Sequence, residues 1–384
     1  MSSSSIPAQQ SRGTRFPRSL LELIQRANTQ TKVRAAIFLA AAWSPAALLS
    51  AINGLTTLKS FLTDFAVESR FLIVIPLLVL AEPPLRGRLE VVARHFSEEG
   101  LIIEGERRRF DSALSTSERL RDSNLAKILA AVLVYVCTLW LIPVVPTSTL
   151  MPWSVAAGKW NHLSAAGTWS ALVSYPILFY LVLLWIWRQL LWTWFLRVVC
   201  TLGLRVVASH PDHCAGLGFL RNSLMGQMPF SFAIGAIAAG GVANRIIYHG
   251  QPPLEFKPVL VVLILFVVAF CVGPMCVFMR ILLQTKRQGA VAYGALASAL
   301  GQQFETKWLG HTRKSTSEIL EVQDFSATTD LYSVVANVHA LRPLPVGVQD
   351  VAGIVVAALV PAIPVALAVF PFEVILKEII KLAL

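Results

Sequence analysis

Charged residues are scarce in this chain. Of its 384 residues only 14% are Asp, Glu, Lys or Arg, whereas 55% are hydrophobic, and the mean hydropathy is +0.63. Charged residues make up about a quarter of an average soluble domain, so this composition lacks the polar surface that a soluble protein of this length needs. The scarcity excludes a soluble protein and indicates that a lipid bilayer surrounds most of the chain.

Motifs for nucleotide binding, hydrolysis and zinc proteolysis are also lacking. The sequence contains no Walker-type phosphate loop, no GxGxxG, no GxSxG and no HExxH. Each of these motifs fixes a backbone geometry or a ligand pair that its chemistry requires. The sequence therefore predicts no bound cofactor, and it favours a protein without catalytic activity while leaving that question open.

Cysteine is rare, with five residues in the chain. All of them except Cys214 stand in strongly apolar stretches. An odd number of buried thiols argues against a disulfide framework, so we interpret them as small core residues.

Long apolar runs are what the chain does contain. Because they are continuous and do not alternate with polar residues, they predict helices and not a barrel. We expect an all-α, polytopic transmembrane helix bundle of about seven spans, six of them plain and the last a Pro-broken span or hairpin, with interfacial helices beside it. The runs are Ala35 to Ile52, Phe71 to Leu85, Ile128 to Val145, Trp169 to Trp187, Met228 to Tyr248, Pro258 to Met279 and Val351 to Phe370.

The basic residues fall mostly on one side of these runs. With the N-terminus inside, the cytoplasmic segments hold 26 of the 33 Lys and Arg residues. Cytoplasmic loops carry this excess, so the count predicts a cytoplasmic N-terminus in a bacterial inner (plasma) membrane. It also explains the net charge of +11 through contact with anionic lipid headgroups, and we expect no nucleic-acid partner.

The pattern divides the chain into four parts. Residues 1–34 form a basic cytoplasmic segment, and residues 35–282 form the transmembrane bundle with a cytoplasmic helical loop at 86–127. Residues 283–349 follow as a cytoplasmic helical segment. Residues 350–384 hold the Pro-broken span or hairpin and an amphipathic helix.

A turn between the fourth and fifth spans is dense in possible ligands. It reads His210-Pro-Asp212-His213-Cys214-Ala-Gly216-Leu-Gly218. His210, His213 and Cys214 are candidate metal ligands, but their spacing matches no established zinc pattern. Proline and glycine are equally what a tight structural turn needs, and glycine amides can also bind an anion or a lipid headgroup.

The same turn resembles the HPD and GLGFL motifs of a family of uncharacterised bacterial polytopic inner-membrane proteins. In that pattern the two positions after HPD vary and a second glycine often stands where this chain has Ala215. The resemblance therefore directs attention to His210, Asp212, Gly216 and Gly218 and away from a metal. It implies no activity.

A polar stripe follows the fourth span, on a helix that we expect to run from Trp169 to Ala208. Arg side chains on such a stripe can reach lipid headgroups, or they can face a hydrated path that favours anions. The stripe consists of Gln189, Thr193, Arg197, Thr201 and Arg205.

Charged residues at the outer ends of two spans suggest an ion pair within the membrane. Asp64 and Glu68 precede the second apolar run, and Arg245 closes the fifth. Since the predicted topology brings all three to the same side, Arg245 and the adjacent Asn244 can pair with one of the carboxylates, or they can extend towards the lipid headgroups.

Three functions fit these observations. The polar stripe and the small residues of the fifth span favour a homo-oligomeric channel or small-solute transporter. The alternatives are a membrane-embedded enzyme or sensor that uses His210 and Asp212, and an assembly protein whose cytoplasmic helices recruit a partner.

Overall fold

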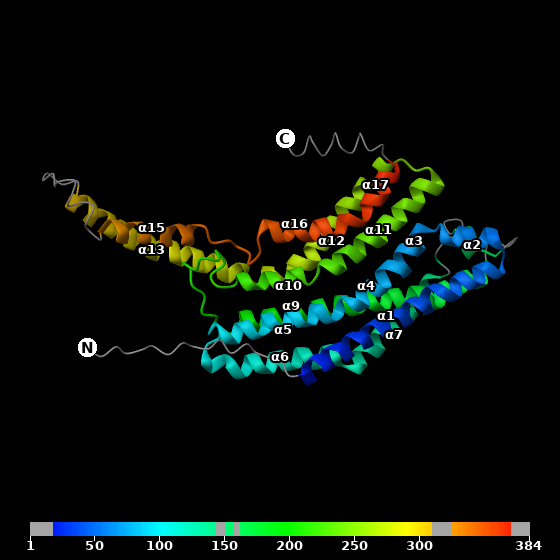
Figure 1. The fold of residues 1–384 in the computed structure, drawn as a ribbon. Coiled ribbons are helices and arrows are strands. Elements are labelled where there is room, and N and C mark those ends of the chain that lie inside the picture. The colour runs from blue at the N-terminus through cyan, green and yellow to red at the C-terminus, as the bar shows by residue number, and fades with distance from the viewer. Residues whose placement is uncertain (1–17, 143, 145–150, 157–161, 309–323, 370–384) are drawn as a thin grey trace, which may run out of the picture.

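A computed structural model describes residues 18–142, 144, 151–156, 162–308 and 324–369. These residues form an elongated bundle of helices (Figure 1), and the only strand-like pairing in them is an isolated bridge between Val155 and Leu163. The predicted all-α fold is confirmed. The predicted amphipathic helix after residue 370 lies outside the described residues.

Six helical segments are long and apolar enough to cross a membrane, which makes this a multi-pass membrane protein. They are Thr29–Ile52, Asn124–Leu141, Ala165–Cys200, Met228–His249, Pro253–Lys307 and Val348–Ala368. The first belongs to α1 (Arg18–Ile52), the second is α7 (Asn124–Leu141), the fourth is α11 (Met228–His249), and the fifth joins α12 (Lys257–Val272) to α13 (Met279–Trp308).

The remaining apolar run is shorter, and one of its faces is buried in the bundle while Leu72, Ile73 and Leu80 are 40%, 47% and 42% exposed. After α2 (Leu55–Leu62), the chain returns through α3 (Phe65–Glu68), the π-helical segment Ser69–Val74 and α4 (Ile75–Leu80). Its side chains Phe71, Ile75 and Leu78 are almost completely buried. This segment therefore packs against neighbouring helices along its length.

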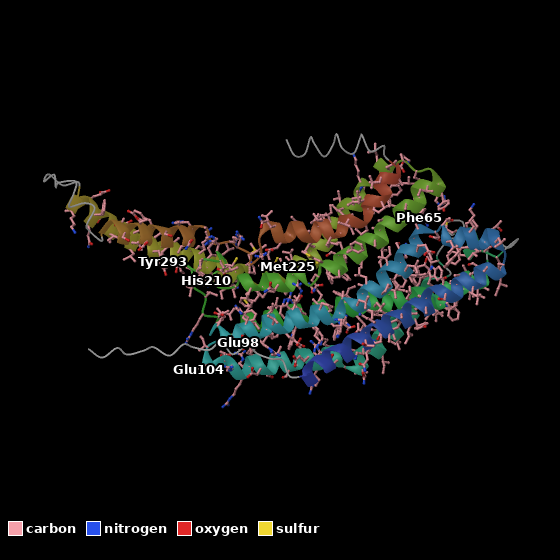
Figure 2. All side chains as sticks on the ribbon, viewed as in Figure 1. Phe65, Glu98, Glu104, His210, Met225 and Tyr293 are labelled. Carbon is pink, nitrogen blue, oxygen red and sulfur yellow. The ribbon has the colours of Figure 1, made fainter. Side chains whose placement is uncertain are left out.

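Two helices cover one end of the bundle, in the region expected to form the loop at 86–127. They are α5 (Glu82–Glu98) and α6 (Arg107–Asp122), which lie alongside the span that ends in α9 (Tyr175–Cys200) in Figure 1. Figure 2 shows Glu98, Glu104 and His210 towards this end and Phe65 towards the other. We refer to the two as the His210 end and the Asp64 end.

Close packing around α11 comes from its small residues. A methyl group at Gly235 would overlap the backbone of Ala358, and one at Gly240 would overlap the hydroxyl of Ser69 and the carbonyl of Phe65. These two contacts lie on different neighbours, α16 (Val348–Leu359) and the segment of α3 with Ser69. Small residues in this span therefore allow close helix packing.

The C-terminal apolar run forms a kinked helix in the described residues. After α16, the backbone tightens at Val360–Ala362 and continues as α17 (Ile363–Val369) in the same general direction (Figure 1). Pro361 removes a backbone donor at the bend. Arg221 of α10 (Arg221–Met225) pairs with the buried Asp350 at 3.2 Å and holds the start of this helix at the His210 end.

A helical hairpin extends beyond the His210 end. It consists of α13 and α15 (Asp324–His339), which lie side by side at the far left of Figure 1. At its base, the hydroxyls of Ser209 and Tyr293 are 3.2 Å apart, and Lys286 donates to the carbonyl of Leu341 at 2.9 Å. The first contact joins the hairpin to the loop that carries His210, and the second joins α13 to the residues that follow α15.

Candidate functional site

Asp64 is the centre of a polar cluster at its end of the bundle. The residue is 3% exposed, and it begins α3 as an N-cap, accepting hydrogen bonds from the backbone N–H groups of Ala66 and Val67. Trp153 and Asn244 donate to the same carboxylate at 2.9 and 2.7 Å. Four donors compensate a buried charge that would otherwise be costly near lipid.

Trp153 also joins this cap to the start of a second helix. Its backbone carbonyl accepts from the hydroxyl of Ser164 at 2.7 Å, and Ser164 caps α8 (Ala165–Trp169) by accepting from the N–H of Gly167. A methyl group at Gly167 would overlap the carbonyl of Ser154. One indole residue thus links the N-termini of α3 and α8.

Both helices then change from α-helical to π-helical hydrogen bonding in the same manner, and we call these two π-helical segments the breaks. Each passes into a π-helical segment, Ser69–Val74 after α3 and Ser170–Ser174 after α8. In both, a proline follows two residues after the segment ends, Pro76 in α4 and Pro176 in α9. Because proline has no N–H, a carbonyl one turn earlier loses its helical donor, and π segments of this kind often occur at functional sites.

Side chains from the two breaks meet each other. Arg70 donates to the hydroxyl of Tyr175 at 3.2 Å, and its guanidinium lies 5.8 Å from the centre of that ring. Ser174 donates to the carbonyl of Ala42 in α1 at 2.6 Å. The breaks are therefore fastened to each other and to the first span.

Glu68 lies at the first break and is half-buried. The indole N–H of Trp43 donates to its carboxylate at 3.1 Å. In the described part of the chain no cation pairs with it, and its charged neighbour is the carboxylate of Asp64. A carboxyl group in these surroundings is well suited to bind a proton or a cation.

Arg245 does not join this cluster in the described structure. Its side chain is exposed, and neither Asp64 nor Glu68 pairs with it. The residue before it, Asn244, occupies the expected place beside Asp64. Successive helical residues point about 100° apart, so only one of these two side chains can face the carboxylate.

The turn of Asp212 folds around that residue's own carboxylate. Backbone N–H groups of Cys214, Gly216 and Gly218 donate to it at 2.8, 3.2 and 2.8 Å. His210 Nδ1 lies 2.8 Å from the same carboxylate. Burial acts to raise the pKa of Asp212, but the three backbone hydrogen bonds outweigh it, and the pKa lies below its ordinary value.

This arrangement explains each of the four residues that the sequence singled out in the turn. Gly216 has a φ of +90°, and a methyl group at Gly218 would press against the Asp212 carboxylate. The amides that could have held an external anion already bind Asp212. The geometry is that of a structural turn, since the N–H groups of Cys214, Gly216 and Gly218 are satisfied within it.

The candidate metal ligands do not gather in one place. His210 is exposed, whereas Cys214 is 2% exposed and its thiol points to the carbonyl of Leu344 at 3.8 Å. Burial raises the pKa of the Cys214 thiol to about 11, so it is protonated at neutral pH. Among the residues that the structure describes, no group of three or more His, Cys, Asp or Glu could hold a metal ion.

The polar stripe changes surroundings along its length. Gln189 is 5% exposed, donates to the carbonyl of Phe270 and accepts from the amide of Gln227 at 2.7 Å. Arg197 and Thr201 are exposed. The helix ends at Cys200, short of the expected Ala208, so Arg205 lies in a loop and its N–H donates to the carbonyl of Leu101.

No known protein family, curated protein or solved structure matches this chain. The resemblance of the Asp212 turn to an inner-membrane family therefore remains a resemblance. Function has to be argued from the geometry.

The sequence reasoning did not place Trp153 in the cluster at the Asp64 end. Trp153 is 3% exposed and binds Asp64. Asn244, the neighbour of Arg245, binds the same carboxylate. The N-cap position of Asp64, directly before Phe65-Ala66-Val67-Glu68, was the available signal.

Proposed function

We propose that this protein is a membrane transporter for a small solute, with its path at the two broken helices. The observation that carries the proposal is the pair of π-helical segments, each followed by a proline and joined through Arg70 and Tyr175. Transporters build binding sites from discontinuous helices, because broken turns offer backbone groups to a solute within the membrane.

Glu68 supplies the coupling site in this proposal. It is half-buried at one of the breaks and has no cationic partner in the described residues. A carboxyl group of this kind releases and binds a proton as its surroundings change from water to protein. Protonation of Glu68 would then accompany each solute.

Transport can be tested in liposomes that contain the purified protein. Currents are recorded on a supported membrane while amino acids, sugars, nucleosides and organic acids are applied in turn at two pH values. The wild type should give a solute-dependent current that grows with the proton gradient, and Glu68→Gln should lose that dependence. Glu255→Gln is the control, because Glu255 is exposed at the same end.

Two outcomes separate the parts of the proposal. Absence of current with every solute class would reject transport along this path. Equal pH dependence in wild type and Glu68→Gln would keep transport but remove Glu68 from proton coupling.

The proposal includes a bacterial inner membrane, a cytoplasmic His210 end and a homo-oligomer. The orientation rests on the distribution of Lys and Arg. The helix α7 offers an apolar surface on which a second copy could pack. Only 11% of this span is buried within one chain, and its Trp140 is 70% exposed. Native mass spectrometry from membranes should give a multiple of the 42.0 kDa chain, and a monomer at all concentrations would exclude the oligomer.

A further inference from the structure

Glu82 follows the first of the two broken helices as the opening residue of α5. One oxygen of its carboxylate accepts a hydrogen bond from Arg188 of α9, and the other lies 4.0 Å from the guanidinium of Arg34 in α1. A single carboxylate therefore joins the first span and both broken helices. Asp64 begins the same broken helix, so a carboxylate that collects donors stands at each end of it.

The two ends of this helix differ in their contact with water. Asp64 is 3% exposed, whereas the side chains of Glu82 and Arg188 are 32% and 15% exposed. Glu82 and Arg188 also line a cleft of about 690 Å³ between α5, α6 and α9, part of which is open to solvent. Water thus approaches the ion pair, and separating its charges costs less there than deep in the bundle.

Trp185 forms a second connection between the same helices, deeper in the bundle. It precedes Arg188 by about one turn of α9 and is 1% exposed. Its indole N–H donates to the carbonyl of Leu78 in α4 at 3.1 Å. Beyond Trp185, α9 leads back to the break at Ser170–Ser174. The ion pair of Glu82 and Arg188 therefore lies between the cleft and the breaks.

Cations outnumber carboxylates at this ion pair. Arg188 and Arg34 share the carboxylate of Glu82, and Arg34 and Arg121 both oppose the charge of Arg188. Arg121 has a carboxylate of its own, Asp122, at 3.3 Å. Without the charge of Glu82, the largely buried Arg188 would lack a counterion and would be repelled by Arg34.

The backbone beside Glu82 is suited to bending. Only Ala81 separates α4 from α5, and Pro83 and Pro84 follow without N–H groups for the carbonyls one turn earlier. Pro76 lies at the opposite end of α4, after the first break. The helical hydrogen bonds are thus interrupted on both sides of α4, which allows Glu82 to move relative to α9.

We propose that Glu82, Arg34 and Arg188 form an ionic gate, which closes the transport path towards the His210 end and opens when a solute passes. The inference rests on the proposed function, because the gate joins the helices that carry the breaks. In the closed state, which is the one described, one carboxylate holds α1, α5 and α9 together. In the open state the three charges separate and are hydrated from the cleft.

Opening can be measured by thiol labelling, which does not require transport. Leu181→Cys is introduced into a chain whose five native cysteines are alanine, and the protein is placed in nanodiscs with a hydrophilic maleimide. Leu181 is 6% exposed and lies about two turns deeper along α9 than Arg188. We expect slow labelling when the gate is intact. Glu82→Gln should raise the rate by at least about tenfold, because a buried cation without a counterion favours opening.

Two controls separate opening of the gate from loss of the fold. Leu196→Cys lies on the same helix but in the other hydrophobic cluster, and it should stay protected in Glu82→Gln. Glu90→Gln removes the ion pair with Arg86 on α5 and should leave Leu181→Cys protected. Equal acceleration at Leu181→Cys and Leu196→Cys would show that Glu82 holds the whole bundle together, and it would overturn the gate.

A double variant tests the repulsion between the cations. Glu82→Gln with Arg188→Gln removes the carboxylate and the buried cation together, while the side chain of Arg34 is 58% exposed to water. Labelling of Leu181→Cys should therefore return to near the rate of the chain with an intact gate. Labelling that stays as fast as in Glu82→Gln alone would overturn an ionic gate.

Transport currents from the same variants separate the gate from the proposed function. Faster labelling in Glu82→Gln without current for any solute class would support opening at this ion pair and reject transport. Solute-dependent current with unchanged labelling in Glu82→Gln would keep transport and overturn the gate.

Discussion

Trp153 donates its indole N–H to Asp64 while its own carbonyl accepts from Ser164, so a single residue fastens the starts of two broken helices. The two helices enter the membrane region from the same end with their N-caps held together. A substitution that removes this link should therefore alter both π-helical segments.

Removing the hydrogen bond between Trp153 and Asp64 should destabilise the bundle. Trp153→Phe keeps the ring but loses a donor to a charged acceptor, at a cost of about 1.5–3 kcal/mol. Asp64→Ala should cost more, because it also removes the α3 cap and leaves Trp153 and Asn244 without an acceptor. Thermal unfolding in detergent measures both losses.

A double-mutant cycle can show whether Asn244 or the adjacent Arg245 interacts with Asp64. Asn244→Ala should be coupled to Asp64→Asn, since the two side chains are 2.7 Å apart. Arg245→Ala should be additive with Asp64→Asn, because Arg245 is exposed. Strong coupling of Arg245 would instead restore the ion pair that the sequence suggested.

Replacing Gly240 with alanine should lower the stability of the protein far more than replacing the adjacent Gly241. Gly240→Ala overlaps Ser69 and Phe65, and overpacking of this kind costs about 1–3 kcal/mol. Gly241→Ala is the matched control, because its nearest new contact would be Arg70 at 3.9 Å. Similar melting temperatures for the two variants would contradict the packing of α11 on α3.

The Asp212 turn should loosen in acid. The folded pKa of Asp212 lies below its ordinary value, so its stabilisation is complete above the pKa of an unfolded aspartate, about 3.9, and is lost as pH falls through the folded pKa. Asp212→Asn should loosen the turn at every pH. Hydrogen exchange at residues 207–220 reports the change.

Cys214 offers an independent measure of the same turn. In a chain whose other cysteines are replaced by alanine, this buried thiol, with its pKa of about 11, should react slowly with maleimide at neutral pH. Asp212→Asn should accelerate labelling by opening the turn. An unchanged rate would mean that Asp212 is not what holds Cys214 in place.

The orientation of the protein in the membrane can be determined by labelling single introduced cysteines. Glu104 and Leu254 are both exposed: Glu104 lies at the His210 end (Figure 2), and Leu254 follows α11, whose Tyr248 donates to the carbonyl of Thr63 at the Asp64 end. With the N-terminus inside, an impermeant maleimide added to intact cells should label Leu254→Cys and spare Glu104→Cys. The reverse pattern would invert the topology.

Much of the fold could be predicted, because a continuous apolar run in a bilayer satisfies its backbone hydrogen bonds by forming a helix. The six candidate spans follow those runs, and the close contacts of Gly235 and Gly240 follow from small residues spaced along one helix. The breaks before Pro76 and Pro176 were harder to predict. A proline in an apolar run disturbs a helix, but the neighbours decide whether the result is a kink or a π segment.

The polar contacts could not be predicted from local pattern alone. Residues four apart on a helix drift by about 40°, so a stripe that begins at Gln189 facing Phe270 reaches the surface by Arg197. The choice of Asn244 over Arg245 at Asp64 likewise depends on how α11 is rotated against α3. That rotation is set by Gly240, far along the chain from Asp64.

The glycines of α11 also bear on how this molecule can move. Gly235 and Gly240 leave α11 with almost no clearance on two neighbours, one in each of two hydrophobic clusters that divide the bundle. Because these contacts leave no free space between the backbones, α11 cannot shift along either neighbour. We therefore expect α11 to keep its position while the surrounding helices move. Rearrangement would then take the form of rocking about this helix, with bending at Pro76 and Pro176.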